Sequence, residues 1–420
     1  MIECDDKLIT YETVRESMSE AGVGLTRKDV TCLLVWRDLL SPNINYRILR
    51  PWQILNRIPF SNVICLKSPL SVVLNESIFL FPSDYDFVPK TYLLPKEYDK
   101  FISDFKETSE KCEDEDEDLF IIKPSNGSLG NGIRLVRKGD IVENSSTQSV
   151  AQQYIRSHLI NDTKFDLRIY ALVVSVDPLE IYVYRNGIAR FCSMKSNVKS
   201  RYSKLTNVSL NKHFNSKNSA YFSSCSSNEN ISQLISDVFD EHFSEEEQNY
   251  IWKEIDRVIL LTLFSGCRYM KKGQDLFIPS YGIYSRCFQI LGFDILLHEK
   301  DLKAYLVEVN YRPSLDYLRA CERRMKIDMI KDSIRISVPH QHYQNLVRDR
   351  QWSWSLLLWQ REALSHPELV EMSKKMRKKV VSESNYEKIW PRKKSPLFEH
   401  YSKILNDLNS LPINCDLVVC

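Results

Sequence analysis

The sequence predicts a mixed α/β (α+β) fold, and three observations lead to this prediction. Apolar runs of strand length, separated by turn residues, recur around residues 120–136, 169–184 and 291–310. A charged stretch that begins at Lys374 instead has the composition of an exposed helix. The chain has 420 residues, of which 43% are hydrophobic, so it can bury a large core in two or three domains.

The first element is a buried strand that runs into a glycine-rich loop. Residues 120–123 read Phe-Ile-Ile-Lys, three glycines follow at Gly127, Gly130 and Gly132, and residues 133–136 form a return strand. Glycine lets backbone N–H groups approach a polyphosphate closely, and Lys123 can meet its charge. The lysine precedes the glycines, so this is not the Gly-x-x-x-x-Gly-Lys loop. The pattern indicates a nucleotide, although glycine-rich hairpins also arise for structural reasons alone.

The next element carries an ionic face. In Lys164-Phe165-Asp166-Leu167-Arg168, strand alternation sends the three charged side chains to one side and the two apolar ones to the other. Strands follow at residues 169–175 and 181–184, and a hairpin over residues 184–190 is expected to bring Arg190 close. A wholly ionic face suits a polar site, and the alternative is a solvated edge strand.

Two apolar strands at residues 291–297 and 304–310 each carry an acid. We expect Asp294 and Glu308 to pair across an antiparallel hairpin, with Asn310 on the same face as Glu308. Hard oxygen ligands that converge on one point are what Mg²⁺ binds, with water and phosphate oxygens in the remaining positions. The alternative is that both acids face solvent.

Basic residues greatly outnumber acids from Lys374 to Lys394, and the first part of this stretch is predicted to be helical. Such a surface can steer a glutamate-rich protein tail toward a site. The alternatives are a solvated helix face or a patch that touches RNA.

Composition excludes several classes of protein. The net charge of +2 argues against a nucleic-acid binder. The acidic start without an apolar segment, and the lack of any long apolar run, argue against secretion and membrane spanning. Eleven cysteines without a Cys-x-x-Cys pair fit reduced thiols in the cytoplasm.

The order of the motifs resembles that of the tubulin tyrosine ligase-like family of the ATP-grasp superfamily. These motifs are a lysine before a glycine-rich hairpin, Lys-Phe-Asp-Leu-Arg, Leu-Thr-Asn at 205–207, Gly-Phe-Asp at 292–294 and Glu-Val-Asn at 308–310. Segments 53–59, 85–95 and 385–391 also resemble this family, so the likeness covers roughly residues 10 to 405. Residues 285–294 and 324–332 are more similar to its polyglutamylase branches.

The resemblance implies an ATP-grasp fold with three lobes. We expect an N-terminal lobe at 1–68, a central lobe with the glycine-rich lid at 69–155, a C-terminal lobe with the metal site and basic helix at 156–405, and a tail at 406–420. ATP would lie between the central and C-terminal lobes. The chain is expected to lack the long microtubule-binding extensions of larger relatives.

The resemblance also implies a role for each site residue. Nucleotide contacts are expected from Lys67, Lys123, Gly130, Gly132, Gln152, Gln153, Tyr154, Ile155, Lys164, Asp166 and Asn207. Arg168 and Arg190 would act at the reacting phosphates, together with Glu308, and Asp294, Glu308 and Asn310 would hold magnesium.

The reaction implied is ATP-dependent addition of glutamate to glutamate side chains of tubulin tails, through an acylphosphate. The expected cofactors are ATP and Mg²⁺, and the expected partners are tubulin or microtubules and free L-glutamate, with no nucleic acid and no membrane. We expect a monomer in the cytoplasm and cytoskeleton, with cilium, flagellum or basal body as further locations.

Four positions depart from the family pattern. Leu129 and Asn131 replace a glutamine and a basic residue in the lid, Lys204 replaces a histidine, and Arg312 replaces a small residue after Glu-Val-Asn. These departures leave open a catalytically weakened tubulin-binding protein. A ligase that adds glycine or tyrosine, or that modifies a non-tubulin acidic protein, also stays open.

Overall fold

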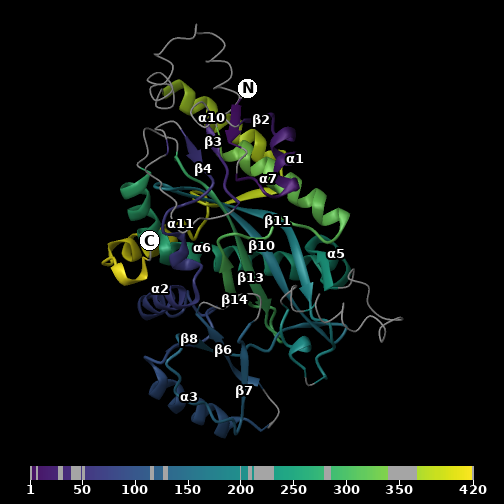
Figure 1. Cartoon of the computed structure of the whole chain (residues 1–420), viewed down its shortest axis with the longest axis vertical. Coiled ribbons are helices and arrows are strands. Elements are labelled where there is room, and N and C mark those ends of the chain that lie inside the picture. The colour runs from purple at the N-terminus through teal and green to yellow at the C-terminus, as the bar shows by residue number, and fades with distance from the viewer. Residues whose placement is uncertain are drawn as a thin grey trace.

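The computed structural model describes residues 2–5, 8–26, 32–38, 49, 53–113, 118–125, 131–198, 200–206, 211, 231–278, 285–338 and 367–418. It confirms a mixed α/β fold built on three sheets. The molecule is elongated, with one small sheet near each end and the largest sheet between them (Figure 1).

The first sheet is parallel and lies at the N-terminal end. Its four strands have the order β2-β1-β3-β4. They are β1 (Ile2–Asp5), β2 (Val23–Thr26), β3 (Leu34–Val35) and β4 (Ile54–Leu55), with α1 (Glu12–Glu20) between the first two. The 3-10 helix η2 (Ser61–Ile64) and α2 (Lys67–Leu80) then lead out of this region.

The second sheet is antiparallel, with the order β5-β8-β6-β7. Its strands are β5 (Thr91–Leu94), β6 (Asp118–Pro124), β7 (Arg134–Arg137) and β8 (Ser149–Gln153), and α3 (Tyr98–Lys111) covers it. Phe101 and Phe105 of α3 pack on Tyr92 and Phe120 of the sheet. The return strand expected after the glycine-rich loop is confirmed as β7.

The third and largest sheet has the order β12-β11-β10-β13-β14, with β15 paired to β11 and β9 to β10. Its long strands are β10 (Thr163–Val176), β11 (Leu179–Phe191), β13 (Gln289–Leu297) and β14 (Ala304–Asn310). The short strands are β9 (Leu159–Ile160), β12 (Ser232–Leu234) and β15 (Tyr386–Trp390). The antiparallel pairing of β13 with β14 was predicted and is confirmed.

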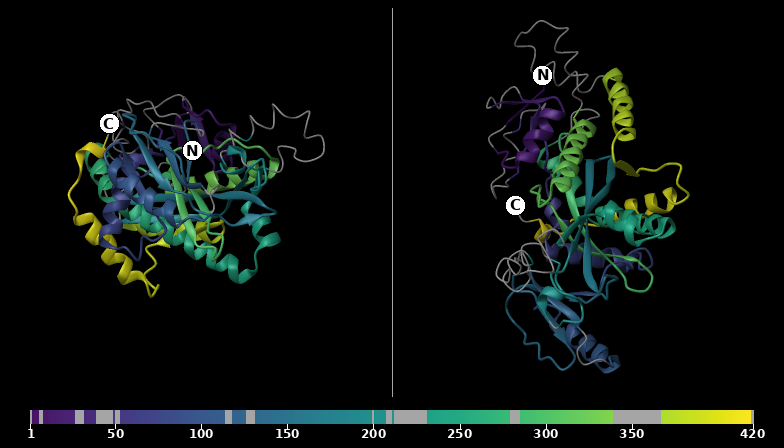
Figure 2. Two further views of the ribbon diagram at one scale, coloured as in Figure 1. Left: turned by 90° about the horizontal axis from the view of Figure 1, so that it is seen from below. Right: turned by 90° about the vertical axis from the view of Figure 1, so that its right-hand side faces the viewer.

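Helices bury both faces of this sheet, as the two views of Figure 2 show. Leu167, Ile169, Ala171 and Val173 of β10 pack in one core with α6 (Glu245–Phe277) and α11 (Phe398–Ser410). Tyr170, Leu172 and Val174 point the other way, into a core with α1 and α7 (Ala320–Ser337). Burial on both faces explains why this part of β10 is continuously apolar.

The remaining described elements lie around the large sheet. They are η3 (Arg201–Ser203), α5 (Ile235–His242), α10 (Pro367–Ser382) and η5 (Cys415–Leu417). The helix predicted in the basic stretch is confirmed as α10. Among the described residues, no helix is long and apolar enough to cross a membrane.

The hairpin expected over residues 184–190 is wrong. These residues belong to the single strand β11, which pairs with β10 on both sides of residues 184–186 and absorbs the irregularity there as a bulge. The Asn186 side chain accepts the N–H of Gly187 and that of Ser236 on α5, so the Asn-Gly pair shapes the bulge instead of a turn.

Candidate active site

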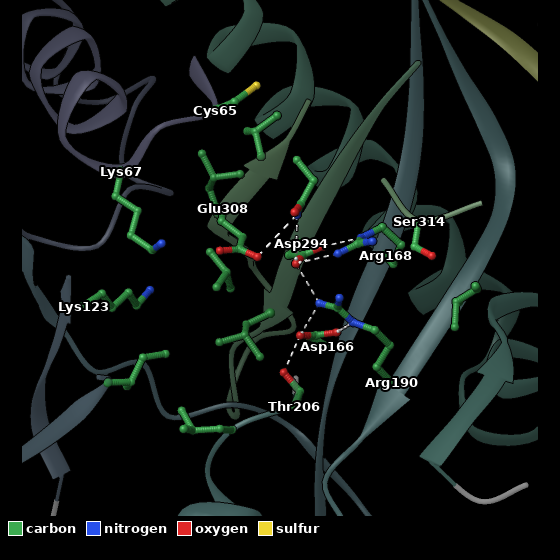
Figure 3. Close-up of a pocket in the computed structure, with 18 of the residues that line it drawn as sticks. Cys65, Lys67, Lys123, Asp166, Arg168, Arg190, Thr206, Asp294, Glu308 and Ser314 are labelled. Atoms are coloured by element: carbon green, nitrogen blue, oxygen red, sulfur yellow. Dashed lines mark hydrogen bonds and ion pairs between the residues drawn. The ribbon is translucent and has the colours of Figure 1, made fainter. Parts of the chain in front are cut away.

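A cavity of about 900 Å³ separates the second sheet from the third. Strands β6 and β8 form one wall, strands β10, β11, β13 and β14 form the other, and Lys67 lies at the start of α2 (Figure 3). A volume of this size is in the range of sites for drug-sized ligands.

Register places three charged residues in one row across the sheet, because Arg168 of β10 lies opposite Asp294 of β13, which lies opposite Glu308 of β14. Two residues earlier on β10, Asp166 lies opposite Arg190 of β11 and borders this row. The predicted pairing of Asp294 with Glu308 and the predicted ionic face of β10 are both confirmed.

The two arginines form hydrogen bonds and ion pairs with Asp294 in this row and with the neighbouring Asp166. Arg168 donates from Nε to Asp294 Oδ1 at 2.5 Å and from Nη2 to Oδ2 at 3.0 Å. Arg190 donates from Nε and Nη2 to Asp166 at 2.6 and 2.7 Å, and its Nη2 also lies 2.8 Å from Asp294 Oδ2. Burial opposes ionisation of Asp294, but the two arginines outweigh it and hold the pKa of this carboxyl well below its usual range.

Glu308 has the opposite electrostatic setting. Burial raises the pKa of Glu308, and the neighbouring Asp294 carboxylate raises it further. Asn310 bridges the two acids, because its Nδ2 donates to Asp294 Oδ2 at 3.3 Å and to Glu308 Oε1 at 3.4 Å. Two acids and an amide therefore converge on one point, where a cation would relieve the repulsion between the carboxylates.

Two lysines approach from the other side of the cavity, and a third, Lys164, lies on β10. Lys67 and Lys123 point their ammonium groups across it toward Glu308 (Figure 3). Lys123 is only 8% exposed and donates to Gln152 Oε1 at 2.8 Å. The pKa of Lys123 is lowered to about 8, chiefly by burial and also by the charges of Lys67 and Lys164, against the attraction of Glu308. An anionic ligand would stabilise the charged form of such a lysine.

Lys164 is held by an aromatic residue. Its Nζ donates to the Tyr154 hydroxyl at 2.8 Å and lies 4.2 Å from the centre of the ring. Tyr154 directly follows β8, so this contact joins the two walls of the cavity.

Most of the predicted site residues line this one cavity. They are Lys67, Lys123, Gln152, Gln153, Tyr154, Ile155, Lys164, Asp166, Arg168, Arg190, Asp294, Glu308 and Asn310. Gly132 does not line it, but its φ of +72° turns the loop beside Pro124. Gly130, Asn207 and Leu129 lie outside the described residues, whereas the departures Asn131, Lys204 and Arg312 line the cavity.

Sequence reasoning missed two features of the site. Thr206 donates a short hydrogen bond to Asp166, and its position between Leu205 and Asn207 of the recognised motif was the available signal. At the other end of the cavity, buried Glu322 of α7 accepts from Ser232 Oγ at 2.6 Å and from Leu318 N at 3.0 Å. No local pattern links Ser232 to Glu322, because they are 90 residues apart.

Within the described part of the chain, the candidate metal ligands are two acids and an amide, Asp294, Glu308 and Asn310. No group of three or more histidine, cysteine, aspartate or glutamate side chains gathers there. The Asp294 and Glu308 carboxylates offer hard oxygen donors of the kind that Mg²⁺ prefers, and this small number suits an ion that keeps several waters or phosphate oxygens. Asn310 would add its Oδ1 only after its amide turned, because its Nδ2 now faces both acids.

The sequence is similar to a known protein family over most of its length. The model of the tubulin-tyrosine ligase family matches residues 46–346. Tubulin polyglutamylase TTLL7 of Mus musculus is 31% identical over 435 residues, which cover 94% of this chain and 46% of the relative. Tubulin polyglutamylase ttll6 of Danio rerio is 30% identical over 331 residues, covering 77% and 41%. The chain thus spans about half the length, or less, of these curated relatives.

Proposed function

Because this chain belongs to the tubulin-tyrosine ligase family, we propose that it is an ATP-dependent ligase that adds glutamate to glutamate side chains of tubulin C-terminal tails. The names of the relatives, which are tubulin polyglutamylases, support both the acceptor and the amino acid. The observation that carries the proposal is one cavity with lysines on one wall and an arginine–carboxylate row on the other.

The lysine wall suits the nucleotide. Lys67 and Lys123 would meet the phosphates of ATP, and the segment Gln152 to Ile155 would receive the adenine between the lobes. The depressed pKa of Lys123 supports this role, because a buried cation whose charge is only partly offset is stabilised when a phosphate arrives.

The opposite wall suits phosphoryl transfer. The acceptor carboxylate would attack the γ-phosphorus of ATP, which releases ADP and forms an acylphosphate. The amine of free glutamate would then attack the acyl carbon, lose a proton and expel phosphate, which leaves an amide bond. Arg168 and Arg190 would stabilise the charge on the transferred phosphoryl group, since both are fixed by acids before substrate binds.

Asp294, Glu308 and Asn310 would hold Mg²⁺ in this scheme. When bound, the ion would neutralise phosphate charge and orient the phosphoryl group. The protein groups themselves bind and position the reactants, so positioning and electrostatics are the main catalytic terms. No side-chain nucleophile is needed.

A second candidate is a tubulin-binding family member with weakened catalysis. Both oxygens of Asp294 accept hydrogen bonds from arginines, which compete with a cation for the same lone pairs. This alternative predicts binding to tubulin without transfer. We further propose that the protein acts as a monomer on the cytoskeleton, including that of cilia, flagella or basal bodies.

The proposal is tested by incubating the protein with purified tubulin, ATP, Mg²⁺ and glutamate, and measuring the masses of the tubulin C-terminal peptides. We expect masses to rise in steps of one glutamyl residue, with ADP formed in proportion. Unchanged peptide masses, with ATP and tubulin binding each demonstrated, would favour the second candidate.

A further inference from the structure

Arg312 lies at the mouth of the cavity on a short segment that follows β14. This rim segment, residues 311–315, begins directly after the metal-ligand candidate Asn310. The Arg312 side chain is exposed, yet it lines the main cavity and also a small neighbouring cavity beside Trp36 and Asp38. It therefore lies where the wall of the cavity meets solvent.

Buried side chains fix the backbone of the rim segment at both ends. Gln289, which is 0% exposed, donates from Nε2 to the Tyr311 carbonyl at 2.9 Å and accepts from Ile58 N at 2.9 Å. Thr13 on α1 donates from Oγ1 to the Leu315 carbonyl at 3.0 Å. The base of the Arg312 side chain is thus set by the core of the protein.

The lack of a side chain at Gly292 lets the rim segment pack close to the row of charged residues that contains Arg168 and Asp294. A Cβ added at Gly292 would lie 2.8 Å from Pro313 Cβ and 3.1 Å from Arg168 Cδ, so both side chains pack over this bare position. Figure 3 shows Ser314 of the rim segment beside Arg168. Arg312 consequently extends from a segment that packs over Gly292, the residue on which Arg168 also packs.

The charge of Arg312 is not neutralised within the described part of the chain. Its guanidinium lies 5.9 Å from the centre of the Tyr311 ring, and no ion pair or hydrogen bond to it occurs there. Arginines with a structural role in this protein behave differently. Arg377, for example, donates to the Ile336 carbonyl at 2.9 Å and to Glu180 at 2.7 Å.

We propose that Arg312 binds a carboxylate group of a substrate at the mouth of the active site. The inference rests on the proposed ligase function, which involves two carboxylate-bearing substrates, the acidic acceptor tail and free glutamate. A guanidinium can bind a carboxylate through two parallel N–H···O bonds, and a fixed base reduces the entropy lost on binding. Arg312 is then a substrate-selecting residue, not a catalytic one.

The test measures equilibrium binding, so it does not require turnover. A fluorescent hexaglutamate peptide and free glutamate are each titrated, by anisotropy and by calorimetry, into the wild type, Arg312→Gln, Arg312→Lys and a control. The control is Lys253→Gln, which removes the same charge from an exposed position of α6 that does not line the cavity.

We expect Arg312→Gln to weaken binding of one ligand roughly tenfold or more, which corresponds to the loss of a charge-assisted contact. Arg312→Lys should restore part of the affinity, and Lys253→Gln should stay within about twofold of wild type. Loss of peptide binding assigns the acceptor tail, and loss of glutamate binding assigns the incoming amino acid. Equal affinities in Arg312→Gln and wild type, or no wild-type binding of either ligand, would overturn the inference.

Transfer is measured separately with labelled glutamate on tubulin. If the wild type binds through Arg312 but transfers nothing, the proposed function fails and the inference stands. If the wild type transfers glutamate and Arg312→Gln binds and transfers equally well, the inference fails and the function stands.

Discussion

At the residue scale, the site depends on charges that the fold removes from water. Lys123, Arg168, Arg190 and Asp294 are all largely buried, so each depends on its neighbours to stay ionised. The arginines and acids satisfy one another, whereas Lys123 donates to a neutral amide, the side chain of Gln152. Removing one charge from this network leaves its partner buried and unpaired, so such substitutions are expected to lower stability as well as activity.

Glu308→Gln should reduce ligation roughly a hundredfold or more, because it removes one charge facing the phosphates and changes little volume. The hydrogen bond from Asn310 can persist, since glutamine also offers an Oε1 acceptor. Transfer of labelled glutamate measures the loss, and circular dichroism with thermal melting checks that the fold is intact. Activity near that of the wild type would show that Glu308 is not a metal ligand.

Lys123 predicts a pH dependence of nucleotide binding. In the folded protein without nucleotide, the pKa of Lys123 is about 8. Above this pH the lysine must therefore take up a proton to form an ion pair with the phosphates. ATP affinity should therefore fall as the pH rises from 8 to 9.5, by at most about tenfold per pH unit. The stability of the nucleotide-free protein should change in the opposite direction to its ATP affinity. Its free energy of unfolding should rise with pH from 8 toward the ordinary lysine pKa, because in this range the unfolded chain binds more protons than the folded one.

The matched variant is Lys123→Arg, whose side chain stays charged over this range. Titrations of ATP into both proteins at several pH values compare the slopes, whatever the absolute affinities. If both proteins show the same slope, Lys123 is not the group that titrates.

Strand alternation was enough to predict much of the site at this scale. The pattern Lys164-Phe165-Asp166-Leu167-Arg168 predicted which side chains share a face, because that depends only on local geometry. The contact of Thr206 with Asp166 spans 40 residues and could not be predicted in this way. Partners so distant along the chain depend on the tertiary fold.

At the element scale, α7 carries an acid that costs stability. Asp332 is 7% exposed, and burial raises its pKa to about 6 despite the nearby cations Lys331 and Arg335. The folded state therefore binds more protons than the unfolded state between pH 4 and 6. The destabilisation is absent at low pH and complete above pH 6.

Asp332→Asn should raise the free energy of unfolding at pH 7.5 by about 1 kcal/mol after allowance for solvent screening. The gain should shrink as the pH is lowered to 5. Urea unfolding at the two pH values measures it. An equal gain at both values would mean that the charge of Asp332 is not responsible.

Helix α10 presents the basic surface predicted from sequence, but part of it has a structural role. Lys374, Lys375, Lys378 and Lys379 are exposed, whereas Arg377 is bound to Glu180. Replacing these four lysines with glutamine should raise the apparent KM for microtubules several-fold and leave the KM for ATP unchanged, because long-range attraction acts on the acidic partner. The difference should fade as salt is added.

The control for α10 removes four charges from another surface. Lys96, Lys100, Lys106 and Lys111, which lie on or just before α3, are also exposed. An unchanged microtubule KM in the α10 variant, or an equal rise in both variants, would contradict steering by this helix.

The hairpin predicted within β11 is wrong, but the position predicted for Arg190 near the site is right. Asn186-Gly187 has the composition of a hairpin turn, and turn chemistry is a local signal. Here both flanks pair with the same strand β10, so a bulge takes up the irregularity and β11 continues to Phe191. Arg190 still reaches the site, because the register of β11 with β10 places it opposite Asp166.

At the scale of the whole molecule, the site forms only where two sheets meet. Local patterns predicted the strand that carries Lys123 and the hairpin that carries Asp294 and Glu308. That the two lie across one cavity follows from how the two sheets are placed relative to each other. The resemblance of the motifs to a known family supplied this arrangement in advance, because a short motif contains no information about the distance between sheets.

The central claim is that this cavity joins glutamate to tubulin at the expense of ATP. The most direct measurement supplies radiolabelled glutamate, glycine and tyrosine in parallel to taxol-stabilised brain microtubules, with ATP and Mg²⁺, and compares the wild type with Glu308→Gln. We predict label from glutamate alone, and its loss in the variant. Label from glycine or tyrosine instead, or from none of the three while ATP binding is intact, would contradict the account.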